Sequence, residues 1–422
     1  MKYSTIVIGD ELLIGQVTDT NSGWIARHLS PLGWEAKSVK VISDDASEIF
    51  NAIDEAFAVT DVVLMTGGLG PTKDDITKAT LCQYFGGEMV LNEDVKRNVD
   101  AQFERRGIPM NRLTAGQAMV PSSCRVIQNE VGTAPIMWFE RDGKVLVSMP
   151  GVPHETQTMM QRAVIPQLLK HFHSDLDIEF RTFVVIDYAE SALAEKLEDY
   201  EKQLPEYIHL AYLPNLGIIR LRLTGAHHDP QVIAAAMEQH SRKLHEILGR
   251  SIIADGDKPL AMIVGERLRE LGLTLSTAES CTGGNVAHVI TEIAGSSDYF
   301  MGSVVSYSND VKQRVLGVDS DTLDTCGAVS QPVVEQMACG VSQLCHTHCA
   351  VATSGVAGPG GGTPLKPVGT VWMAAKVGES VVSQCLHLPG DRKQVITRAT
   401  NQALIMLLKL LQQAMPGQAR LD

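Results

Sequence analysis

The sequence lacks the features that mark several large classes of protein. None of its apolar runs reaches the roughly 18 residues that a membrane-spanning helix needs. Its beginning meets carboxylates at Asp10 and Glu11, too early for a secretory signal peptide. Basic residues are outnumbered, 36 Lys+Arg against 49 Asp+Glu, and the net charge of -13 argues against polyanionic partners. We therefore expect a cytoplasmic protein that binds neither membranes nor nucleic acid.

Cysteines are few, and they are scattered along the chain. The eight cysteines form no regular framework, which favours reduced thiols in the cytosol over structural disulfides. Hydrophobic residues make up 44% and charged residues 20% of the 422 residues, an ordinary globular composition. At roughly 100–200 residues per domain, this length predicts two or three domains.

Short apolar runs that suit strands alternate with longer helical patterns in both halves of the chain, as in α/β folds with mostly parallel sheets. The pattern changes in residues 173–254, which have the βαββα order of a KH-like module. We predict an α/β protein in which two three-layer α/β domains, residues 1–172 and 255–418, are joined by this small α+β domain. The middle segment lacks the Gly-x-x-Gly loop with which KH domains clamp RNA, so we expect a spacer or a dimerisation element.

A glycine-rich loop follows the buried strand predicted at Asp61–Met65. It reads Thr66-Gly67-Gly68-Leu69-Gly70-Pro71-Thr72-Lys73-Asp74-Asp75. Glycines let backbone N–H groups approach an anion closely, and the dipole of a following helix favours negative charge. The loop is neither a Walker A sequence nor a dinucleotide fingerprint, and a plain capped turn remains the alternative. We predict a nucleotide or phosphate site formed by Gly67, Gly68, Gly70, Thr72 and Lys73.

Acidic residues follow two of the strands predicted in the same half. Asp10 and Glu11 follow the first strand, and Asp74 and Asp75 belong to the glycine loop. Both turns are expected at the carboxyl edge of one sheet, where doubly wound folds bind their ligands. Carboxylates there can hold a divalent cation that bridges two phosphates. We therefore predict a divalent metal ion held by Asp10, Glu11, Asp74 and Asp75.

Several motifs of this half resemble the molybdopterin-binding-like domain of the CinA family of competence/damage-inducible proteins. The matching segments are Gly9–Leu13, Thr66–Asp75, Gly132–Pro135 and Pro150–Pro153. The resemblance covers residues 1–170, and it implies metal-dependent pyrophosphatase activity on ADP-ribose. One departure follows Gly132–Pro135, where Ile136-Met137-Trp138 stands in place of an expected glycine. This departure weakens the substrate assignment for this half more than it weakens the predicted fold.

In the other half, a serine follows the predicted strand Thr274–Thr277. The strand runs into Ala278-Glu279-Ser280-Cys281-Thr282-Gly283-Gly284 and then into a helical pattern. A strand-to-helix turn exposes the Ser280 hydroxyl, and N–H groups of the helix can form an oxyanion hole. The alternative is that Ser280 only caps the helix. A Ser-His-Asp triad is not indicated, and Cys281 is a rival nucleophile because thiolates are intrinsically stronger.

Lys312 is the candidate base for this serine. A neutral, desolvated lysine can deprotonate a serine, and Tyr307 can relay or donate the proton. Tyr307 and Lys312 are five positions apart, or about 140° on a helix, so they converge only if Tyr307 precedes the helix. The spacing also differs from the Tyr-x-x-x-Lys of short-chain dehydrogenases, which argues against a nicotinamide-dependent oxidoreductase.

A second glycine-rich loop, Ser354–Thr363, follows the predicted strand Cys349–Ala352. Its amides can close around a phosphate or an oxyanion, although a plain flexible loop is the alternative. We do not assign zinc to Cys345-His346-Thr347-His348-Cys349, because no second ligand pair follows it. The candidate substrate-binding residues of this half are Thr282, Gly283, Gly284, Ser354, Gly355, Gly358 and Gly360.

The same segments resemble the C-terminal domain of the CinA family, a nicotinamide-nucleotide amidohydrolase. The matching segments are Ala278–Gly284, Gly302–Lys312, Gly317-Val318, Gly327–Ser330 and Ser354–Thr363, within residues 257–415. The resemblance implies that Ser280 is a nucleophile activated by Lys312 and Tyr307, with Arg398 as a candidate partner of the substrate's charge. It implies hydrolysis of nicotinamide mononucleotide to nicotinate mononucleotide and ammonia, without a cofactor, by a homodimer. The alternative is a molybdopterin-binding or competence-linked binding protein without deamidase activity.

Overall fold

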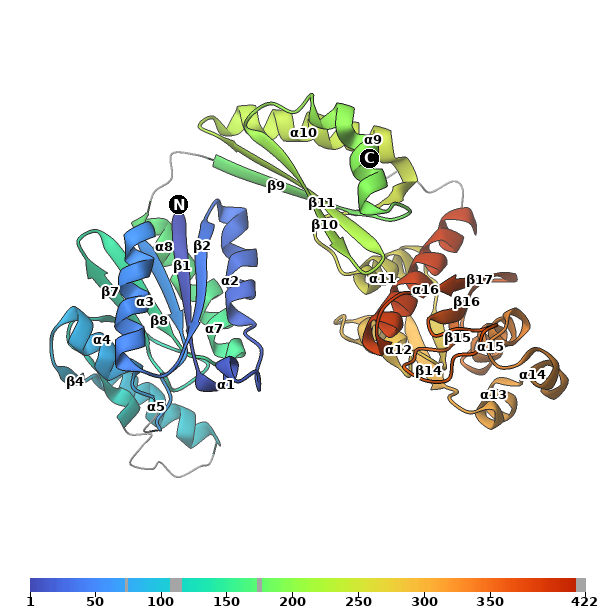
Figure 1. Ribbon diagram of the computed structural model, residues 1–422, viewed down its shortest axis with the longest axis horizontal. Coiled ribbons are helices and arrows are strands. Elements are labelled where there is room, and N and C mark those ends of the chain that lie inside the picture. Colours follow the sequence, from blue (N-terminus) through green and yellow to red (C-terminus); the bar gives the residue numbers. More distant parts are fainter. Residues whose placement is uncertain (73–74, 107–115, 173–176, 415–422) are drawn as a thin grey trace. The chain divides into compact units, whose positions relative to one another are not determined.

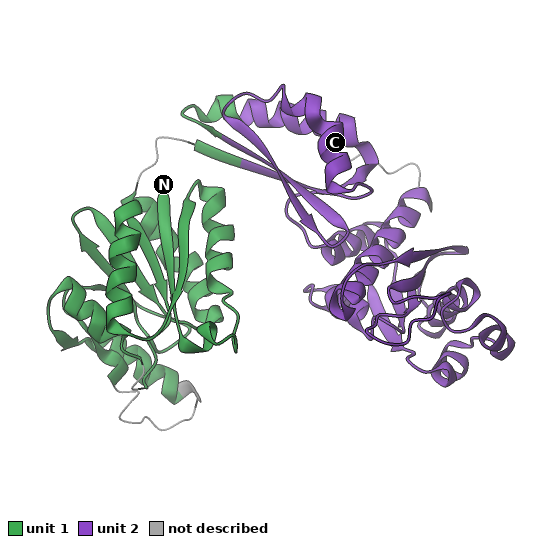
Figure 2. Ribbon diagram, in the orientation of Figure 1, with its two compact units in different colours: residues 1–179, 226–233 green, residues 180–225, 234–422 purple. Residues whose placement is uncertain are grey.

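The computed structural model describes residues 1–72, 75–106, 116–172 and 177–414 (Figure 1). Contacts divide the chain into two compact units (Figure 2). The first comprises Met1–Glu179 and Ala226–Ile233, and the second comprises Phe180–Gly225 and Ala234–Asp422. The second unit joins most of the KH-like segment to the last predicted domain, so the three-domain boundaries stay a prediction. No helix in the described ranges is long and apolar enough to cross a membrane.

The first unit contains a six-stranded sheet in the order β2-β1-β3-β8-β7-β6. Strands β2, β1, β3 and β8 are parallel to one another, whereas β7 pairs antiparallel with both β8 and β6. The strands span β1 Lys2–Ile8, β2 Glu35–Ile42, β3 Val62–Thr66, β6 Arg125–Ile127, β7 Ile136–Arg141 and β8 Lys144–Met149. Every residue of β3 is buried, as its continuous apolar run predicts.

Helices cover both faces of this sheet (Figure 1). One face carries α2 Asn21–Leu29, α7 Pro153–Met159 and α8 Ile165–His171, and the other carries α3 Ala46–Val59 and α4 Thr77–Phe85. Val62 and Leu64 of β3 enter the first core, whereas Val63 and Met65 enter the second, because successive strand side chains point to opposite faces. The unit also contains α1 Asp10–Leu13, α5 Glu93–Arg106 and the paired strands β4 Met89–Leu91 and β5 Met119–Pro121.

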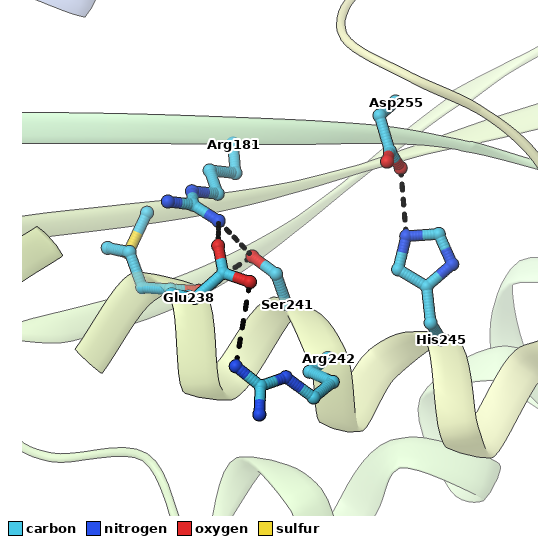
Figure 3. Close-up of polar contacts among 7 residues, drawn as sticks. Arg181, Glu238, Ser241, Arg242, His245 and Asp255 are labelled. Carbon is cyan, nitrogen blue, oxygen red and sulfur yellow. Dashed lines mark hydrogen bonds and ion pairs between the residues drawn. The ribbon is translucent and has the colours of Figure 1, made fainter. Parts of the chain in front are cut away.

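The KH-like segment forms a four-stranded sheet in the order β10-β11-β9-β12. Its elements are β9 Asp177–Val185, α9 Glu190–Glu201, β10 Ile208–Asn215, β11 Ile218–His227, α10 Pro230–Leu248 and β12 Ile252–Asp255. Ion pairs join α10 to the sheet: Arg181 Nη1 lies 2.6 Å from Glu238 Oε2, and His245 Nε2 lies 2.9 Å from Asp255 Oδ1 (Figure 3). These pairs are partly exposed, so each contributes little to the stability of the fold. Burial of Met237, at 0% exposure, stabilises the attachment of α10 more, by about 1.5–3 kcal/mol.

The last part of the chain forms a five-stranded sheet in the order β14-β13-β15-β16-β17. Its strand β13 Leu275–Glu279 lies between β14 Phe300–Val305 and β15 Cys349–Gly355 and is parallel to both, while β16 Thr370–Val377 and β17 Ser380–His387 continue antiparallel. One face packs against α15 Gln331–Leu344, next to α13 Asn309–Leu316 and α14 Ser320–Cys326. The other packs against α11 Leu260–Leu271, α12 Asn285–Thr291 and α16 Arg392–Ala414. The predicted α/β class with a KH-like segment is confirmed.

Residues of the KH-like segment contribute to the core of this last sheet. Val184, Ile186 and Ile218 are buried in one cluster with Val264 of α11. The Asn401 side chain of α16 also donates a hydrogen bond to the Leu216 carbonyl, at 2.9 Å. The two parts therefore share one hydrophobic core, which is why contacts place them in the same unit.

Candidate active site

Ser280 lies directly after β13, at the carboxyl end of that strand. Its backbone N–H donates to the Thr353 carbonyl at 2.9 Å, which ties the turn to β15. Lys312 extends from α13, where the Ser308 hydroxyl caps the helix start by accepting from the Val311 N–H at 3.3 Å. The Lys312 Nζ lies 3.0 Å from the Ser280 Oγ. The structure thus brings together the predicted nucleophile and the predicted base.

The Lys312 side chain is almost completely buried, at 1% exposure. Its Nζ also donates a hydrogen bond to the Ser306 carbonyl at 2.6 Å, which holds the amine beside the serine. Burial disfavours the ammonium form and lowers the pKa of Lys312 below its ordinary value. A lysine with a lowered pKa is more often neutral near pH 7, and only the neutral amine can take a proton from Ser280.

Tyr307 precedes α13, as its spacing from Lys312 required, but its side chain is 63% exposed. Its hydroxyl accepts a hydrogen bond from the Arg392 Nη2 at 3.1 Å. Among the residues that the structure describes, this is the partner of the Tyr307 hydroxyl, and Tyr307 is not brought into hydrogen-bond contact with Ser280 or Lys312. Of the three predicted catalytic residues, Ser280 and Lys312 are therefore in contact, whereas the Tyr307 hydroxyl is hydrogen-bonded to an arginine.

Glu279, immediately before the serine, was missed by the sequence analysis. Its side chain is fully buried, and its carboxylate accepts hydrogen bonds from the backbone N–H groups of Gly284, Val286 and Ala287 at 2.8–3.0 Å. These are the amides at the start of α12, so they are not free to form the oxyanion hole that the sequence analysis assigned to them. Ser280 does not cap this helix either, since its N-cap residue is Gly284. An acidic residue just ahead of a helix was the signal that could have revealed this role.

The backbone N–H groups of Cys281 and Thr282 remain available in the same turn. Neither donates to an acceptor within the described part of the chain, whereas the next amide, of Gly283, donates to the Ser280 carbonyl at 3.1 Å. The Thr282 hydroxyl is oriented by Glu279 Oε2 at 2.7 Å. Burial raises the pKa of the Cys281 thiol to about 12, so the thiol stays protonated and is a poor rival to Ser280.

The predicted residues of the second glycine loop have different roles. The Ser354 hydroxyl is directed away from the serine turn and donates to the Ala328 carbonyl at 2.7 Å. A side chain at Gly355 would place its Cβ 2.6 Å from the Thr370 carbonyl oxygen, so this glycine permits close strand packing. The Gly358 carbonyl accepts from Arg392 Nη1 at 2.8 Å, whereas Gly360 has open space around it.

A pocket lies beside the serine turn, at the start of α16. It is lined by three predicted residues, Thr282, Gly283 and Gly284, and by two cations that were not predicted, Arg392 and Lys393. Arg398, the predicted charge partner, does not line it. Its Nε is buried without a hydrogen-bond partner among the residues described. The Gly390-Asp391-Arg392-Lys393 run at the helix start was the signal for this cationic site.

The segment Cys345–Cys349 is not a metal centre in this structure. Cys349 is buried in the sheet, and the His348 Nδ1 lies 2.9 Å from the Thr274 hydroxyl. Across the described residues, no group of three or more His, Cys, Asp or Glu side chains is placed to hold a metal ion.

The first unit holds a separate pocket of about 530 Å³ at the carboxyl ends of β1 and β3. Predicted residues line it: Glu11, Gly67, Gly68, Gly70, Thr72 and Asp75. Lys73 and Asp74 lie outside the described residues. Gly67 has a φ of +110°, and a Cβ there would lie 2.1 Å from the Ile8 carbonyl oxygen, so only glycine allows the two strand ends to approach.

Asp75 closes the glycine loop on itself. Its carboxylate accepts from the Gly70 N–H at 2.7 Å, the Thr72 N–H at 2.9 Å and the Thr72 hydroxyl at 2.6 Å. The following helix, α4, begins at Thr77 with Ile76 as its N-cap, directly after the loop, as predicted. Asp75 satisfies amides of the loop itself.

Asp44, which follows β2, is an acidic residue of this pocket that was not predicted. Burial and the negative charges of Asp10, Asp75 and Glu11 raise the pKa of Asp44 to about 6. Four carboxyl groups therefore gather near one another, although the described residues contain no group of three placed as metal ligands. The argument that found Asp10, an acid at a strand end, also applies to Asp44.

Comparisons with known proteins give matches along nearly the whole length of the chain. Three family models match successive segments: a probable molybdopterin binding domain over residues 4–170, a damage-inducible protein CinA KH domain over 180–254 and a CinA C-terminal domain over 257–411. A CinA-like protein from Flavobacterium psychrophilum is 41% identical over 414 residues, which cover 97% of this chain and 98% of that protein. The chain belongs to the CinA family.

Further relatives match all or part of the chain. A putative competence-damage inducible protein from Caldicellulosiruptor saccharolyticus is 35% identical over 417 residues, covering 97% of this chain and 99% of that protein. A crystal structure of a CinA superfamily protein from Klebsiella pneumoniae is 36% identical and covers 36% of this chain and 96% of that chain, with a TM-score of 0.36. The resemblance to the CinA family drawn from the sequence motifs is confirmed.

Proposed function

We propose that the last domain hydrolyses the carboxamide of nicotinamide mononucleotide to give nicotinate mononucleotide and ammonia. The observation that carries the proposal is the 3.0 Å approach of a buried lysine amine, Lys312 Nζ, to the Ser280 hydroxyl. A serine paired with a desolvated lysine is an activated nucleophile that needs no histidine. Membership of the CinA family supports an enzyme, and the substrate and reaction are our assignment.

In the first half of the proposed reaction, neutral Lys312 takes the proton of Ser280, and Oγ attacks the carboxamide carbon. The N–H groups of Cys281 and Thr282 stabilise the oxyanion of the tetrahedral intermediate. The C–N bond then breaks, and the Lys312 ammonium returns the proton so that ammonia leaves. In the second half, Lys312 takes a proton from water, which attacks the carbonyl carbon of the acyl-serine ester. The bond to Ser280 Oγ then breaks, the Lys312 ammonium returns the proton to Oγ, and the product acid loses its proton to solvent and leaves as the carboxylate.

The cations at the start of α16 support a phosphorylated substrate. Arg392 and Lys393 line the pocket next to Thr282, and Arg392 is held by the Gly358 carbonyl and the Tyr307 hydroxyl. A guanidinium held in this way binds a phosphate with little further loss of side-chain freedom. In this proposal Tyr307 supports Arg392 rather than relaying the serine proton.

The direct test measures ammonia release by the full chain from nicotinamide mononucleotide, nicotinamide riboside and nicotinamide. We expect release from the mononucleotide and a much lower kcat/KM for the two amides that lack the phosphate. No ammonia from any of the three would reject the deamidase. It would favour the alternative of a binding protein.

For the first unit, we propose hydrolysis of ADP-ribose with a divalent metal ion. Glu11 and Asp44 line the pocket with carboxylate oxygens, the ligand type that Mg²⁺ or Mn²⁺ prefers, and they would hold the ion together with phosphate oxygens of the substrate. A bound cation would offset the burial and the negative charges that raise the pKa of Asp44, and it would supply charge neutralisation for the phosphates. The pocket itself supplies the Gly68 N–H, which donates to no acceptor in the described ranges. Release of AMP and ribose 5-phosphate that stops with EDTA tests this second activity.

A further inference from the structure

A buried carboxamide lines the pocket of the first unit and has one unsatisfied atom. Asn21 is the first residue of α2 and is 5% exposed. Its Nδ2 donates to the Thr66 hydroxyl at 3.1 Å and to the Gly151 carbonyl at 2.9 Å. Its Oδ1 is buried and has no hydrogen-bond partner among the described residues. A buried acceptor without a donor is destabilising and calls for a partner from outside the chain.

The orientation of this carboxamide follows from its two neighbours. The Gly151 carbonyl can only accept a hydrogen bond. The Thr66 hydroxyl gives its own proton to the Pro150 carbonyl at 2.6 Å, so it too presents a lone pair to Asn21. An amide turned by 180° would set Oδ1 against both acceptors. The Nδ2 must therefore face Thr66 and Gly151, which leaves Oδ1 as the atom available to a ligand.

The groups around Asn21 indicate the chemistry of that ligand. Glu11 and Asp44, which line the same pocket, are further oxygen acceptors. Gly68 and Leu69 also line the pocket, and their backbone N–H groups have no acceptor within the part of the chain described. Acceptors suit hydroxyl groups, and paired amides in a glycine turn suit a phosphate. A phosphorylated sugar carries both kinds of group.

We propose that Asn21 Oδ1 accepts a hydrogen bond from a ribose hydroxyl of a phosphorylated sugar whose phosphate contacts the amides of Gly68 and Leu69. Asn21 is then a specificity-determining residue that favours ribose over deoxyribose. The proposal deepens the function proposed for this pocket by naming a contact with the sugar. It requires only binding, so it does not depend on hydrolysis or on a metal ion.

Titration calorimetry on the full chain tests this contact. The probes are ribose 5-phosphate and its 2-deoxy and 3-deoxy analogues, each titrated with Mg²⁺ and with EDTA. We expect wild-type protein to bind ribose 5-phosphate about tenfold or more tightly than one of the deoxy analogues, as for loss of a partner to a buried acceptor. Asn21→Ala and Asn21→Ser should bind ribose 5-phosphate and that deoxy analogue with equal affinity.

Asn129→Ala is the matched control. Asn129 is buried in the same unit, and its Nδ2 donates to the Ala134 carbonyl, but its Oδ1 is satisfied by the Val131 N–H and it does not line the pocket. It should lose thermal stability and keep the wild-type preference for ribose. The proposal is overturned if wild-type protein binds neither sugar phosphate, if it shows no preference between ribose and both analogues, or if a folded Asn21 variant keeps the wild-type preference. A separate assay of ADP-ribose hydrolysis tests the proposed pyrophosphatase activity.

Should Asn21→Ala not fold, Asn21→Ser carries the comparison, because serine is well tolerated at a helix start. Should neither variant fold, the titrations of wild-type protein test the proposal alone. Equal affinity for ribose 5-phosphate and both deoxy analogues would contradict it directly.

Discussion

The amine of Lys312 lies 3.0 Å from the hydroxyl of Ser280 and is held there by the Ser306 carbonyl. The pair joins the end of β13 to the first turn of α13, and Lys312 is 1% exposed. Water is therefore a poor competitor for the amine, and the ammonium form is disfavoured.

Replacing Ser280 by alanine removes only the attacking oxygen from a partly exposed turn. We expect ammonia release to fall at least about 10³-fold, while the free energy of unfolding changes by no more than about 1 kcal/mol. Steady-state kinetics and thermal melting measure both effects. Cys281→Ser is the control and should keep most of the activity, because the buried thiol is not the nucleophile. A folded Ser280→Ala protein with more than about a tenth of the wild-type rate excludes covalent catalysis through this residue.

The rate should depend on pH through Lys312. Because burial lowers the pKa of Lys312, its neutral form is lost as pH falls through that lowered value. The rate is therefore expected to rise with pH and to level off above the lowered pKa, which lies below that of an exposed lysine. Lys312→Arg should be nearly as inactive as Lys312→Ala, because a guanidinium stays protonated and cannot act as a base. Substantial activity in Lys312→Arg contradicts the serine–lysine mechanism.

Glu279→Gln keeps the size of the side chain but replaces an acceptor oxygen by an amide nitrogen. That nitrogen would face backbone N–H groups at the start of α12, which need acceptors. We expect a loss of about 1–3 kcal/mol in the free energy of unfolding and a lower kcat, because the Ser280 turn is no longer held. Glu292→Gln, an exposed change just after the same helix, should alter neither value. A wild-type melting temperature for Glu279→Gln would show that this carboxylate does not hold the helix start.

Arg392→Ala should weaken binding of the substrate phosphate. We expect the KM for nicotinamide mononucleotide to rise about tenfold or more, with little change for nicotinamide riboside, since loss of one charge-assisted hydrogen bond is worth about 1.5–3 kcal/mol. Arg398→Ala is a matched control on the same helix, because Arg398 does not line the pocket. A larger effect of Arg398→Ala than of Arg392→Ala on the preference for the mononucleotide would show that the phosphate binds elsewhere.

Asp44→Asn tests whether the two sites are independent. Asp44 lines the pocket of the first unit, and burial and the negative charges of three neighbouring carboxylates disfavour its ionised form and raise its pKa. We expect metal-dependent hydrolysis of ADP-ribose to fall at least about 10²-fold, while deamidation stays within about twofold of wild type. Both assays are run on the same preparation of the full chain. Loss of deamidation in a folded Asp44→Asn protein would reveal coupling between the sites.

Some features of the sites were predictable because they depend on residues close in sequence. The glycines after β3 and the serine after β13 follow apolar runs that indicate buried strands, and strand ends position a loop at the sheet edge. Lys312 was selected by its chemistry and by family resemblance rather than by geometry.

The α/β class, the KH-like segment, the order of the elements and the two turns that carry the sites were predictable from the amino-acid sequence. These follow from apolar periodicity and glycine placement, which are properties of neighbouring residues. Which side chains meet became known only from the folded chain: Glu279 with the amides of α12, Asp44 with the carboxylates of the first pocket, and Arg392 rather than Arg398 with Tyr307. The reason is that such contacts depend on how far each helix is rotated and shifted against its sheet. Packing of the whole core sets that rotation, and a local pattern does not.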